Sequence, residues 1–146
     1  MIVAIGSDHA GYEYKVKVVE FLKTLGYEVL DLGCDGPASV DYPDFGAAVG
    51  NAVVQGKAEK GIVICGSGIG ISIAANKVNG VRCALCHDHL SASLCRQHND
   101  ANVVSMGARL IGIEVAFDIV KTFLETPFEG GRHQKRIDKI SALEQH

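Results

Sequence analysis

The stretch GIVICGSGIGISIAANK, residues 61–77, determines how this chain is expected to fold. Its opening apolar residues are typical of a buried strand, and the residues from Ile71 onward have the pattern of the first turns of a helix. Glycines at positions 66, 68 and 70 lie between the two. A strand that turns through glycines into a helix directs backbone N–H groups and the positive end of the helix dipole at one point. We expect Cys65, at the carboxyl end of the strand, to face that point.

This position suits a reactive thiol. Backbone N–H groups and a helix N-terminus stabilise a thiolate, and they also stabilise an oxyanion that forms beside it. A base or nucleophile next to an anion-binding loop indicates an enzyme, so Cys65 is the first candidate for a catalytic residue.

Strand and helix patterns alternate along the rest of the chain. Short apolar strands are expected at residues 2–5, 28–32, 62–65, 81–86 and 103–106, with apolar residues at helical spacing between and after them. This alternation predicts an α/β fold: a doubly wound, five-stranded parallel sheet in a three-layer sandwich of the Rossmann or flavodoxin type. We expect one domain over residues 1–146, with ligands bound beyond the carboxyl ends of the strands.

The last segment, residues 132–145, differs from the others. Its apolar residues form only a thin stripe on a charged helix: Ile137, Ile140, Ala142 and Leu143. Such a stripe suits an extra C-terminal helix that packs on another subunit, and a solvated terminal helix is the alternative.

Composition excludes several classes of protein. The net charge of −3 argues against a nucleic-acid partner, since such proteins are normally basic. No uncharged stretch reaches the ~20 apolar residues of a membrane span. Met1 leads directly into a strand, without the features of a signal peptide, so we expect a cytoplasmic protein with no membrane partner.

The cysteines are expected to be reduced. Their number, 5, is odd and does not suit a disulfide framework. Cys83 and Cys86 have the spacing of a zinc knuckle, but residues three apart on a strand point to opposite faces. We therefore predict buried small side chains there, and no metal site.

Three polar motifs flank predicted strands. Ser7-Asp8-His9-Ala10-Gly11 follows the first strand, the cysteine loop follows the third, and Arg96-Gln97-His98-Asn99-Asp100 precedes the fifth. We expect all three at one edge of the sheet, although Asp8 could simply cap the helix after it. Arg132 and Arg136 share one face of the last helix, and with Arg109 they are candidates to bind phosphate through their guanidinium groups.

Together the motifs resemble the type B ribose-5-phosphate isomerase family, which also includes the subunits of galactose-6-phosphate isomerase. The resemblance covers nearly the whole chain, in order. It is carried by the three motifs above, by the helix that follows the cysteine loop, by Asp41-Tyr42-Pro43 and by Glu129-Gly130-Gly131-Arg132-His133.

The resemblance implies an aldose–ketose isomerase of the pentose phosphate pathway. It would interconvert D-ribose 5-phosphate and D-ribulose 5-phosphate through an enediolate, without metal or cofactor. Allose 6-phosphate and galactose 6-phosphate are the alternative substrates within the family. Such proteins are expected to be homodimers or dimers of dimers, with active sites at the subunit boundary.

The same resemblance assigns roles to residues. Cys65 is the base, His98 opens the sugar ring with Asp41 as its orienting partner, and the Ser67 hydroxyl lies beside the reacting oxygens. Some family members replace the cysteine and carry a glutamate base at the position of Ile71, so this chain resembles the cysteine-base group. The remaining expected substrate contacts are sugar hydroxyls for Asp8 and Asn99, the enediolate for Gly66, Gly68, Ile69 and Gly70, and phosphate for His9, Arg109, Arg132 and Arg136.

Three other functions are weighed against this one. A nucleotide-binding oxidoreductase would use the glycine loop with Asp88 as its ribose-binding acid, but only Ile69 separates the second and third glycines, where the dinucleotide motif needs two residues. A non-catalytic sensor would bind the sugar phosphate without converting it. A redox thiol protein would need a Cys-x-x-Cys partner, which Cys65 lacks.

Overall fold

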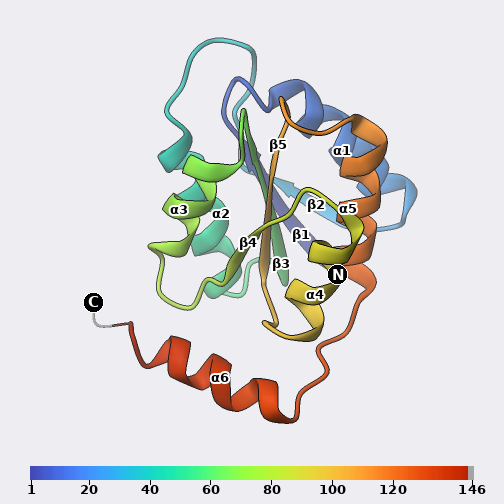
Figure 1. The fold of residues 1–146 in the computed structure, drawn as a ribbon. Coiled ribbons are helices and arrows are strands. Elements are labelled where there is room, and N and C mark those ends of the chain that lie inside the picture. The colour runs from blue at the N-terminus through green and yellow to red at the C-terminus, as the bar shows by residue number, and fades with distance from the viewer. Residues whose placement is uncertain (145–146) are drawn as a thin grey trace.

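The five predicted strands form one parallel sheet in the computed structural model, which describes residues 1–144. The strands are β1 (Ile2–Ser7), β2 (Glu28–Asp31), β3 (Lys60–Cys65), β4 (Cys83–Leu85) and β5 (Val103–Gly107). Their order in the sheet is β2-β1-β3-β5-β4 (Figure 1). The predicted doubly wound α/β fold is confirmed.

The register of the sheet determines which residues share an edge. Ser7 lies opposite Ile64 of β3, and Cys65 lies opposite Gly107 of β5. The carboxyl ends of these three strands therefore meet at one edge, at the top of Figure 1, which we call the carboxyl edge. Gly61 lies opposite Val103, so β3 and β5 both begin at the other edge, the amino edge.

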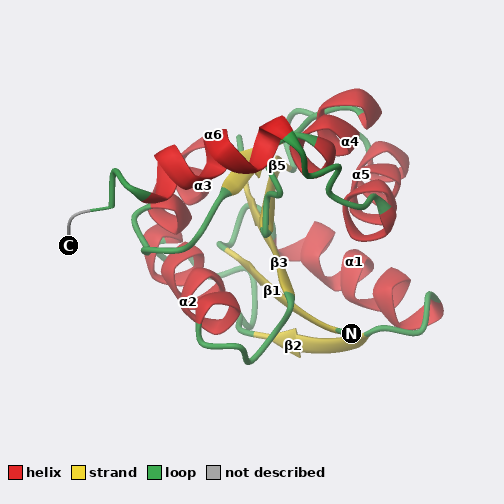
Figure 2. Ribbon diagram, turned by 90° about the horizontal axis from the view of Figure 1, so that it is seen from below, coloured by secondary structure: helices red, strands yellow, loops and turns green. Residues whose placement is uncertain are grey.

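Helices cover both faces of the sheet, which gives the three layers (Figure 2). α1 (Tyr12–Thr24), α4 (His89–Gln97) and α5 (Ile113–Glu125) lie on one face, where Val18, Leu22 and Phe123 are fully buried. α2 (Tyr42–Val54) and α3 (Ile69–Asn76) lie on the other, where Val49 and Ile71 are fully buried. The sheet thus lies between two apolar cores, one on each face.

Asp88 serves as the N-cap of α4. Its carboxylate accepts a hydrogen bond from the Ser91 backbone N–H at 2.7 Å. This hydrogen bond, with a second from the Ser91 side chain, lowers the pKa of Asp88. The residue considered as a ribose-binding acid is thus used by its own helix, which weakens the case for a dinucleotide-binding protein.

β4 is shorter than the predicted strand at residues 81–86. It is an edge strand that pairs only with β5. The strand starts at Cys83, two residues after the predicted start, and ends at Leu85, one residue before the predicted end. The N–H of Arg82 donates to the side chain of Asn102 at 2.8 Å, so Arg82 is not part of the strand. A side chain therefore replaces the backbone partner that would have extended the strand.

The last helix, α6 (Arg132–Ser141), crosses the amino edge and lies apart from the other helices (Figure 1). It ends before Gln145, the predicted end, which lies outside the described residues. Ile137 is buried against its own chain, whereas Ile140 is 45% and Leu143 is 75% exposed. The predicted apolar stripe is thus only partly covered within one chain.

Within residues 1–144, no helix has the length and hydrophobicity needed to cross a lipid bilayer.

Candidate active site

A cavity of about 640 Å³ opens at the carboxyl edge, where β1, β3 and β5 end. Its polar lining comes from the three loops that follow these strands, and its apolar rim comes mainly from α3 and the loop after β5. The polar side chains are Asp8, His9, Cys65, Ser67 and Arg109, and the apolar ones include Ile69, Ile73 and Leu110. The first two predicted motifs and Arg109 therefore do meet at this edge.

Cys65 ends β3 with its sulfur at the base of the glycine loop. The Gly68 backbone N–H donates to Cys65 Sγ at 3.1 Å, and the residue is only 4% exposed while it lines the cavity. Gly68 has a φ of 76°, and a Cβ there would lie 2.7 Å from the Met106 carbonyl carbon. Because only glycine fits this backbone, the loop can place an N–H against the sulfur, an arrangement that suits negative charge on that atom.

The loop also presents donors to the cavity. The first N–H groups of a helix have no partners within the helix. In α3, the Ile69 N–H donates to Ser67 Oγ at 3.2 Å, and Gly70 lines the cavity close to the ring of Tyr42. The Ser105 hydroxyl donates to the Gly68 carbonyl at 2.7 Å and holds the turn from below. The result is a fixed set of N–H groups beside the thiol.

Asp8 and His9 are both held by backbone groups. Asp8 accepts a hydrogen bond from the Gly11 N–H at 3.1 Å, so it supports the turn into α1 in addition to lining the cavity. His9 Nδ1 accepts the Val40 N–H at 3.2 Å. An accepting Nδ1 places the proton of a neutral ring on Nε2, which leaves that atom as a donor.

Arg109 is positioned by its backbone and by Gly66. Its N–H donates to the Gly66 carbonyl at 2.9 Å, and a Cβ on Gly66 would lie 3.3 Å from the Arg109 guanidinium carbon. The guanidinium therefore lies over the glycine loop and brings positive charge to the cavity that His9 also lines.

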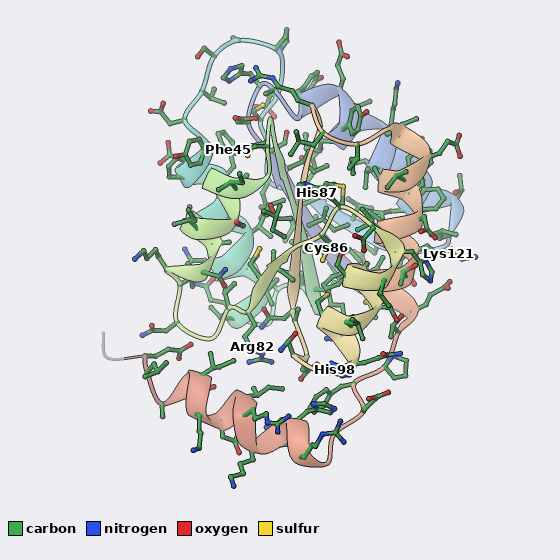
Figure 3. The ribbon with its side chains drawn as sticks, viewed as in Figure 1. Phe45, Arg82, Cys86, His87, His98 and Lys121 are labelled. Atoms are coloured by element: carbon green, nitrogen blue, oxygen red, sulfur yellow. The ribbon has the colours of Figure 1, made fainter. Side chains whose placement is uncertain are left out.

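The third predicted motif lies at the opposite edge. His98 and Asn99 follow α4 and precede β5, which runs parallel to β3. The five residues of β5 separate this segment from the Cys65 edge by roughly 13 Å, at ~3.3 Å per residue. The prediction of one shared edge was therefore wrong within a single chain: strand direction places a segment before β5 at the amino edge. Arg132 and Arg136, on α6, lie there too, and Figure 3 shows His98 next to α6.

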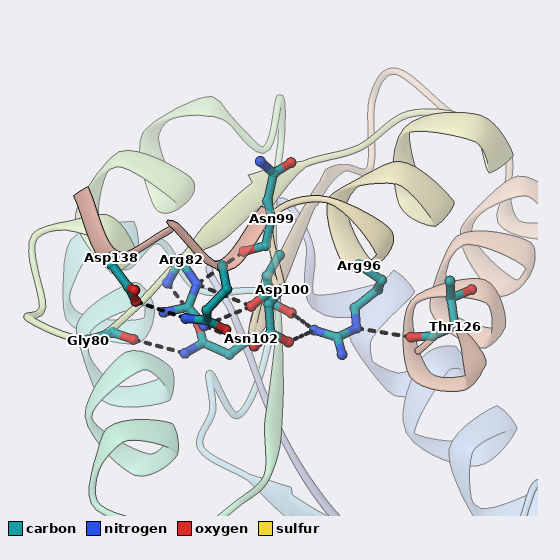
Figure 4. A network of polar contacts seen from close by, with 10 residues as sticks. Gly80, Arg82, Arg96, Asn99, Asp100, Asn102, Thr126 and Asp138 are labelled. Atoms are coloured by element: carbon teal, nitrogen blue, oxygen red, sulfur yellow. Dashed lines mark hydrogen bonds and ion pairs between the residues drawn. The ribbon is translucent and has the colours of Figure 1, made fainter. Parts of the chain in front are cut away.

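A buried arginine fixes the turn that carries His98 and Asn99. Arg96 is 7% exposed and donates to Asp100 Oδ1 at 2.8 Å and to the Ala101 carbonyl at 2.7 Å (Figure 4). Arg82 donates to the Asp100 carbonyl at 2.9 Å and to the Asn99 carbonyl at 3.1 Å. These bonds hold Asp100 at a φ of 45°, so the conformation of the turn is fixed by side-chain hydrogen bonds.

Glu129 is the carboxylate near His98 in this chain. Glu129 Oε1 lies 3.8 Å from His98 Nε2 and 3.7 Å from His133 Nε2, and the two rings stack with centroids 4.4 Å apart. Burial, followed by the charges of His98 and Arg132, lowers the pKa of His133. Glu129 and His133 both belong to the motif at residues 129–133. Their spacing of four alone does not bring them together, because α6 begins only at Arg132.

Asp41 does not occupy the predicted position beside His98 of its own chain. It is the N-cap residue of α2 and directly precedes Tyr42, which lines the cavity at the carboxyl edge. Its proposed partner lies at the amino edge. A contact between the two therefore requires His98 of a second chain.

All five cysteines are free thiols, as predicted. In the part of the chain that the structure describes, only one group of three or more histidine, cysteine or acidic residues could hold a metal ion, and it consists of His98, Glu129 and His133. Cys83 and Cys86 do not belong to it.

This chain is similar to known proteins over nearly its whole length. Residues 3–140 match the family model described as Ribose/Galactose Isomerase. A putative sugar phosphate isomerase of Bacillus subtilis is 52% identical over 99% of this chain and 98% of its own length. Ribose-5-phosphate isomerase B of Escherichia coli is 46% identical, with coverage of 98% and 96%.

Solved structures give the same result. Ribose-5-phosphate isomerase B of Clostridium thermocellum matches with a TM-score of 0.97 and 52% identity, covering 98% of this chain and 97% of that one. The enzyme of the same name from Mycoplasma genitalium, with bound ribulose 5-phosphate, matches with a TM-score of 0.93 and 44% identity, covering 97% and 94%.

Proposed function

The chain belongs to the ribose/galactose isomerase family, and from that premise we propose that it interconverts D-ribose 5-phosphate and D-ribulose 5-phosphate. The observation that carries the proposal is the position of Cys65 Sγ, which lines the cavity and accepts the Gly68 N–H at 3.1 Å. An aldose–ketose isomerase needs a base beside a site for an oxyanion, and both are present at the end of β3. The reaction belongs to pentose phosphate metabolism.

Cys65 moves the proton between the two carbons. Its thiolate takes the proton from C2 of the open-chain aldose, and the electron pair moves to form the enediolate with negative charge on O1. The same sulfur returns the proton to C1, while a proton passes from O2 to O1 and O2 becomes the ketone oxygen. The Ser67 hydroxyl, in the same cavity, lies beside these oxygens in the proposed complex.

The glycine loop supplies most of the stabilisation. A proton next to a carbonyl is weakly acidic, so the rate depends on how well the enediolate oxygen is held. The N–H groups of Gly66, Gly68, Ile69 and Gly70 belong to the loop or to the first turn of α3 and contribute this positive potential. Two of them have partners before substrate binds: the Gly68 N–H donates to Cys65 Sγ and the Ile69 N–H donates to Ser67 Oγ. An enediolate oxygen therefore has to share these two donors or replace those partners.

His9 and Arg109 bind the phosphate from the cavity side. The His9 Nε2–H and the Arg109 guanidinium are donors on two loops of the same cavity, and a guanidinium matches the geometry of phosphate oxygens. Asp8 contacts sugar hydroxyls from the loop that also carries His9. These contacts hold C1 and C2 beside Cys65.

Ring opening uses a second chain. Ribose 5-phosphate is mainly a closed furanose, and we assign its opening to His98, whose own chain places it at the edge opposite Cys65. A homodimer, or a dimer of such dimers, would bring His98, Asn99, Arg132 and Arg136 of one copy to the cavity of the other. The exposed rim supports this assembly, since Ile69 is 50%, Ile73 56% and Leu110 57% exposed around the cavity.

A coupled assay on a panel of phosphorylated sugars tests the function. Ribose 5-phosphate is expected to give the highest kcat/KM, with allose 6-phosphate and galactose 6-phosphate as comparisons. A higher kcat/KM for either hexose phosphate would reassign the substrate within the family. Binding of ribose 5-phosphate without turnover would instead indicate a sensor and contradict the proposal.

Solvent exchange separates the two assigned roles. Ribulose 5-phosphate cannot close to a furanose through its phosphorylated terminal oxygen, so it reaches Cys65 without ring opening. In D2O, exchange of its C1 proton is expected to persist in His98→Asn and to disappear in Cys65→Ala, since a general base contributes about 10² to 10⁴-fold. Loss of exchange in both variants would argue against the division of roles.

A further inference from the structure

The cluster of His98, Glu129 and His133 has a property that isomerisation does not need. Nε2 of each histidine lies within 4 Å of the same oxygen, Glu129 Oε1, at 3.8 Å and 3.7 Å. One ligand atom from each of the three residues lies within 4.8 Å of the others. Three potential ligands thus converge on one point at the amino edge.

These distances are close to those of a tetrahedral metal site. Zinc bonds to imidazole nitrogen and carboxylate oxygen are about 2.0 to 2.2 Å, so neighbouring ligand atoms are about 3.3 to 3.5 Å apart. Each histidine nitrogen therefore has to approach Glu129 by only a few tenths of an ångström. The ligand atoms of the two histidines lie within 4.8 Å of each other, so these two atoms have to move closer together as well. The rings stack at an angle of 15°, and one of them must turn its nitrogen toward the ion. The His98 side chain, 41% exposed, has room to do so.

The protein holds the other two ligands. The His133 side chain is only 8% exposed, at the start of α6. The Glu129 N–H donates to the Gln97 carbonyl at 3.1 Å, which ties this segment to the end of α4. Within one chain the Glu129 side chain is 53% exposed, so the cluster has room for a water molecule as the fourth ligand of an ion. In the proposed dimer this edge faces the cavity of the second chain, and an ion would reach the cluster through that cavity.

We propose that His98, Glu129 and His133 form a binding site for a divalent transition-metal ion of the Zn²⁺ class, and that an ion bound there withdraws His98 from ring opening. Two imidazoles and one carboxylate suit Zn²⁺, Co²⁺ and Ni²⁺, whereas Mg²⁺ prefers oxygen ligands. The second half of the proposal rests on the proposed role of His98. The metal is an inhibitor here and has no part in the isomerisation.

Nearby positive charge limits the affinity. Arg132 directly precedes His133, and Arg136 lies one turn further along α6; both act electrostatically on His133. Only Glu129 supplies a negative ligand. We therefore expect reversible binding, weaker than that of a structural zinc site with four protein ligands.

Cobalt titration of the whole protein tests the site without any activity measurement. Co²⁺ is expected to bind at one equivalent per chain with the visible absorption of a tetrahedral nitrogen and oxygen site, and Zn²⁺ should displace it while Mg²⁺ should not. Glu129→Gln and His133→Asn should each weaken binding by about tenfold or more, since even changes to outer-shell partners cost 10 to 100-fold. Glu129 is on the surface, so its variant is expected to fold normally.

His89→Asn is the matched control. His89 is also an exposed histidine beside an acid, with Nδ1 3.0 Å from Asp118 Oδ2, but it lies outside the cluster. Its variant should bind Co²⁺ like the natural chain. Binding that survives Glu129→Gln and His133→Asn, that weakens equally in His89→Asn, or that shows sulfur-to-cobalt charge transfer would overturn the site.

Inhibition tests the consequence for His98. Zn²⁺ should inhibit the isomerisation of ribose 5-phosphate, EDTA should restore it, and Glu129→Gln should resist inhibition relative to its own metal-free rate. If Zn²⁺ inhibited the Glu129→Gln variant as strongly as the natural chain, the proposed effect of the ion on His98 would be overturned. Because the cobalt titration needs no substrate, it decides the metal site even if the proposed isomerase activity fails.

Discussion

The thiols of this chain differ in exposure and in the groups around their sulfur atoms. Cys65 lines the cavity and accepts one N–H, whereas Cys86 is 1% exposed and hydrogen-bonded to Cys95, which lowers the pKa of Cys86. Burial and the neighbouring Cys86 raise the pKa of Cys83 to about 12. Poor access for the reagent therefore limits the reactivity of Cys86, and the raised thiol pKa limits the reactivity of Cys83.

Iodoacetamide at pH 8 is expected to alkylate Cys65 before the other cysteines. Cys65 faces a cavity that a small reagent can enter, while Cys86 is enclosed and Cys83 remains protonated. Cys34 also lines a cavity, but its thiol donates to the Gly36 carbonyl at 3.4 Å, whereas the Cys65 sulfur accepts an N–H. Peptide mass spectrometry over time should show carboxamidomethyl Cys65 appearing in step with loss of isomerase activity, and ribose 5-phosphate should slow both. Inactivation that precedes labelling of Cys65, or that follows labelling of Cys86, would assign the essential thiol elsewhere.

At the scale of elements, α4 depends on its N-cap. Asp88 accepts the Ser91 N–H at 2.7 Å, and these hydrogen bonds lower the pKa of Asp88. Asp88→Ala should lower Tm at neutral pH, because the cap is lost. A carboxyl group with a lowered folded-state pKa stabilises the protein above its unfolded value of about 3.9 and loses that effect as pH falls through the folded value. The difference in Tm between the two proteins should therefore narrow below about pH 4.

Asp88→Asn is the control for this prediction. Asparagine is also a good N-cap, but it carries no charge. The Tm of Asp88→Asn at neutral pH should lie close to that of the natural chain. The difference in Tm between Asp88→Asn and Asp88→Ala should not change as the pH is lowered. If the difference in Tm between the natural chain and Asp88→Ala stayed the same down to pH 3, the charged cap would not be the cause of that difference.

The whole molecule divides the proposed site between its two edges. Cys65 lies at one edge, and His98 and Arg132 lie at the other, so two copies related by a twofold axis would complete each other. Cys65→Ala mixed with His98→Asn under subunit exchange should therefore recover activity. Half of the dimers would be mixed and each would hold one intact site, which gives about a quarter of natural activity.

The pair His98→Asn and Arg132→Ala is the matched control for complementation. Both changes fall at the amino edge, so no mixed dimer of these two contains an intact site, and activity should stay low. Activity assays and size-exclusion chromatography of the mixtures give the measurement. A monomer with full activity would rule out the shared site. If only the control pair recovered activity, Cys65 and His98 of one chain would belong to the same site.

Much of this arrangement was predictable from the sequence. The alternating patterns predicted every strand and helix. The glycine loop pointed to Cys65 and Ser67, and the end of the fifth strand pointed to Arg109, because strand ends and the loops after them are local features. The length of β4 was not predictable, since it depends on the Asn102 side chain, which is distant in sequence. Glu129 was overlooked because its partner His98 is brought to it by the course of α4 and α5.

The position of His98 shows a different limit. Its motif is a local feature of the sequence, but the direction of β5 places His98 at the edge away from Cys65. A pattern along one chain cannot distinguish a residue of that chain's own site from one that serves a neighbour. The family resemblance implied a dimer, and the register of the sheet shows that His98 could meet Cys65 only from a second copy.

The separation of the two edges makes catalysis depend on how much protein is present. On the proposed assembly, each chain carries halves of two different sites that face away from each other, so a solitary chain would complete neither. On the proposed assembly, turnover per chain falls on dilution below the dissociation constant of the dimer, and the total rate then rises with the square of the chain concentration. A small change in expression near that threshold would alter flux more than proportionally, a sensitivity that a self-contained site on one edge would lack.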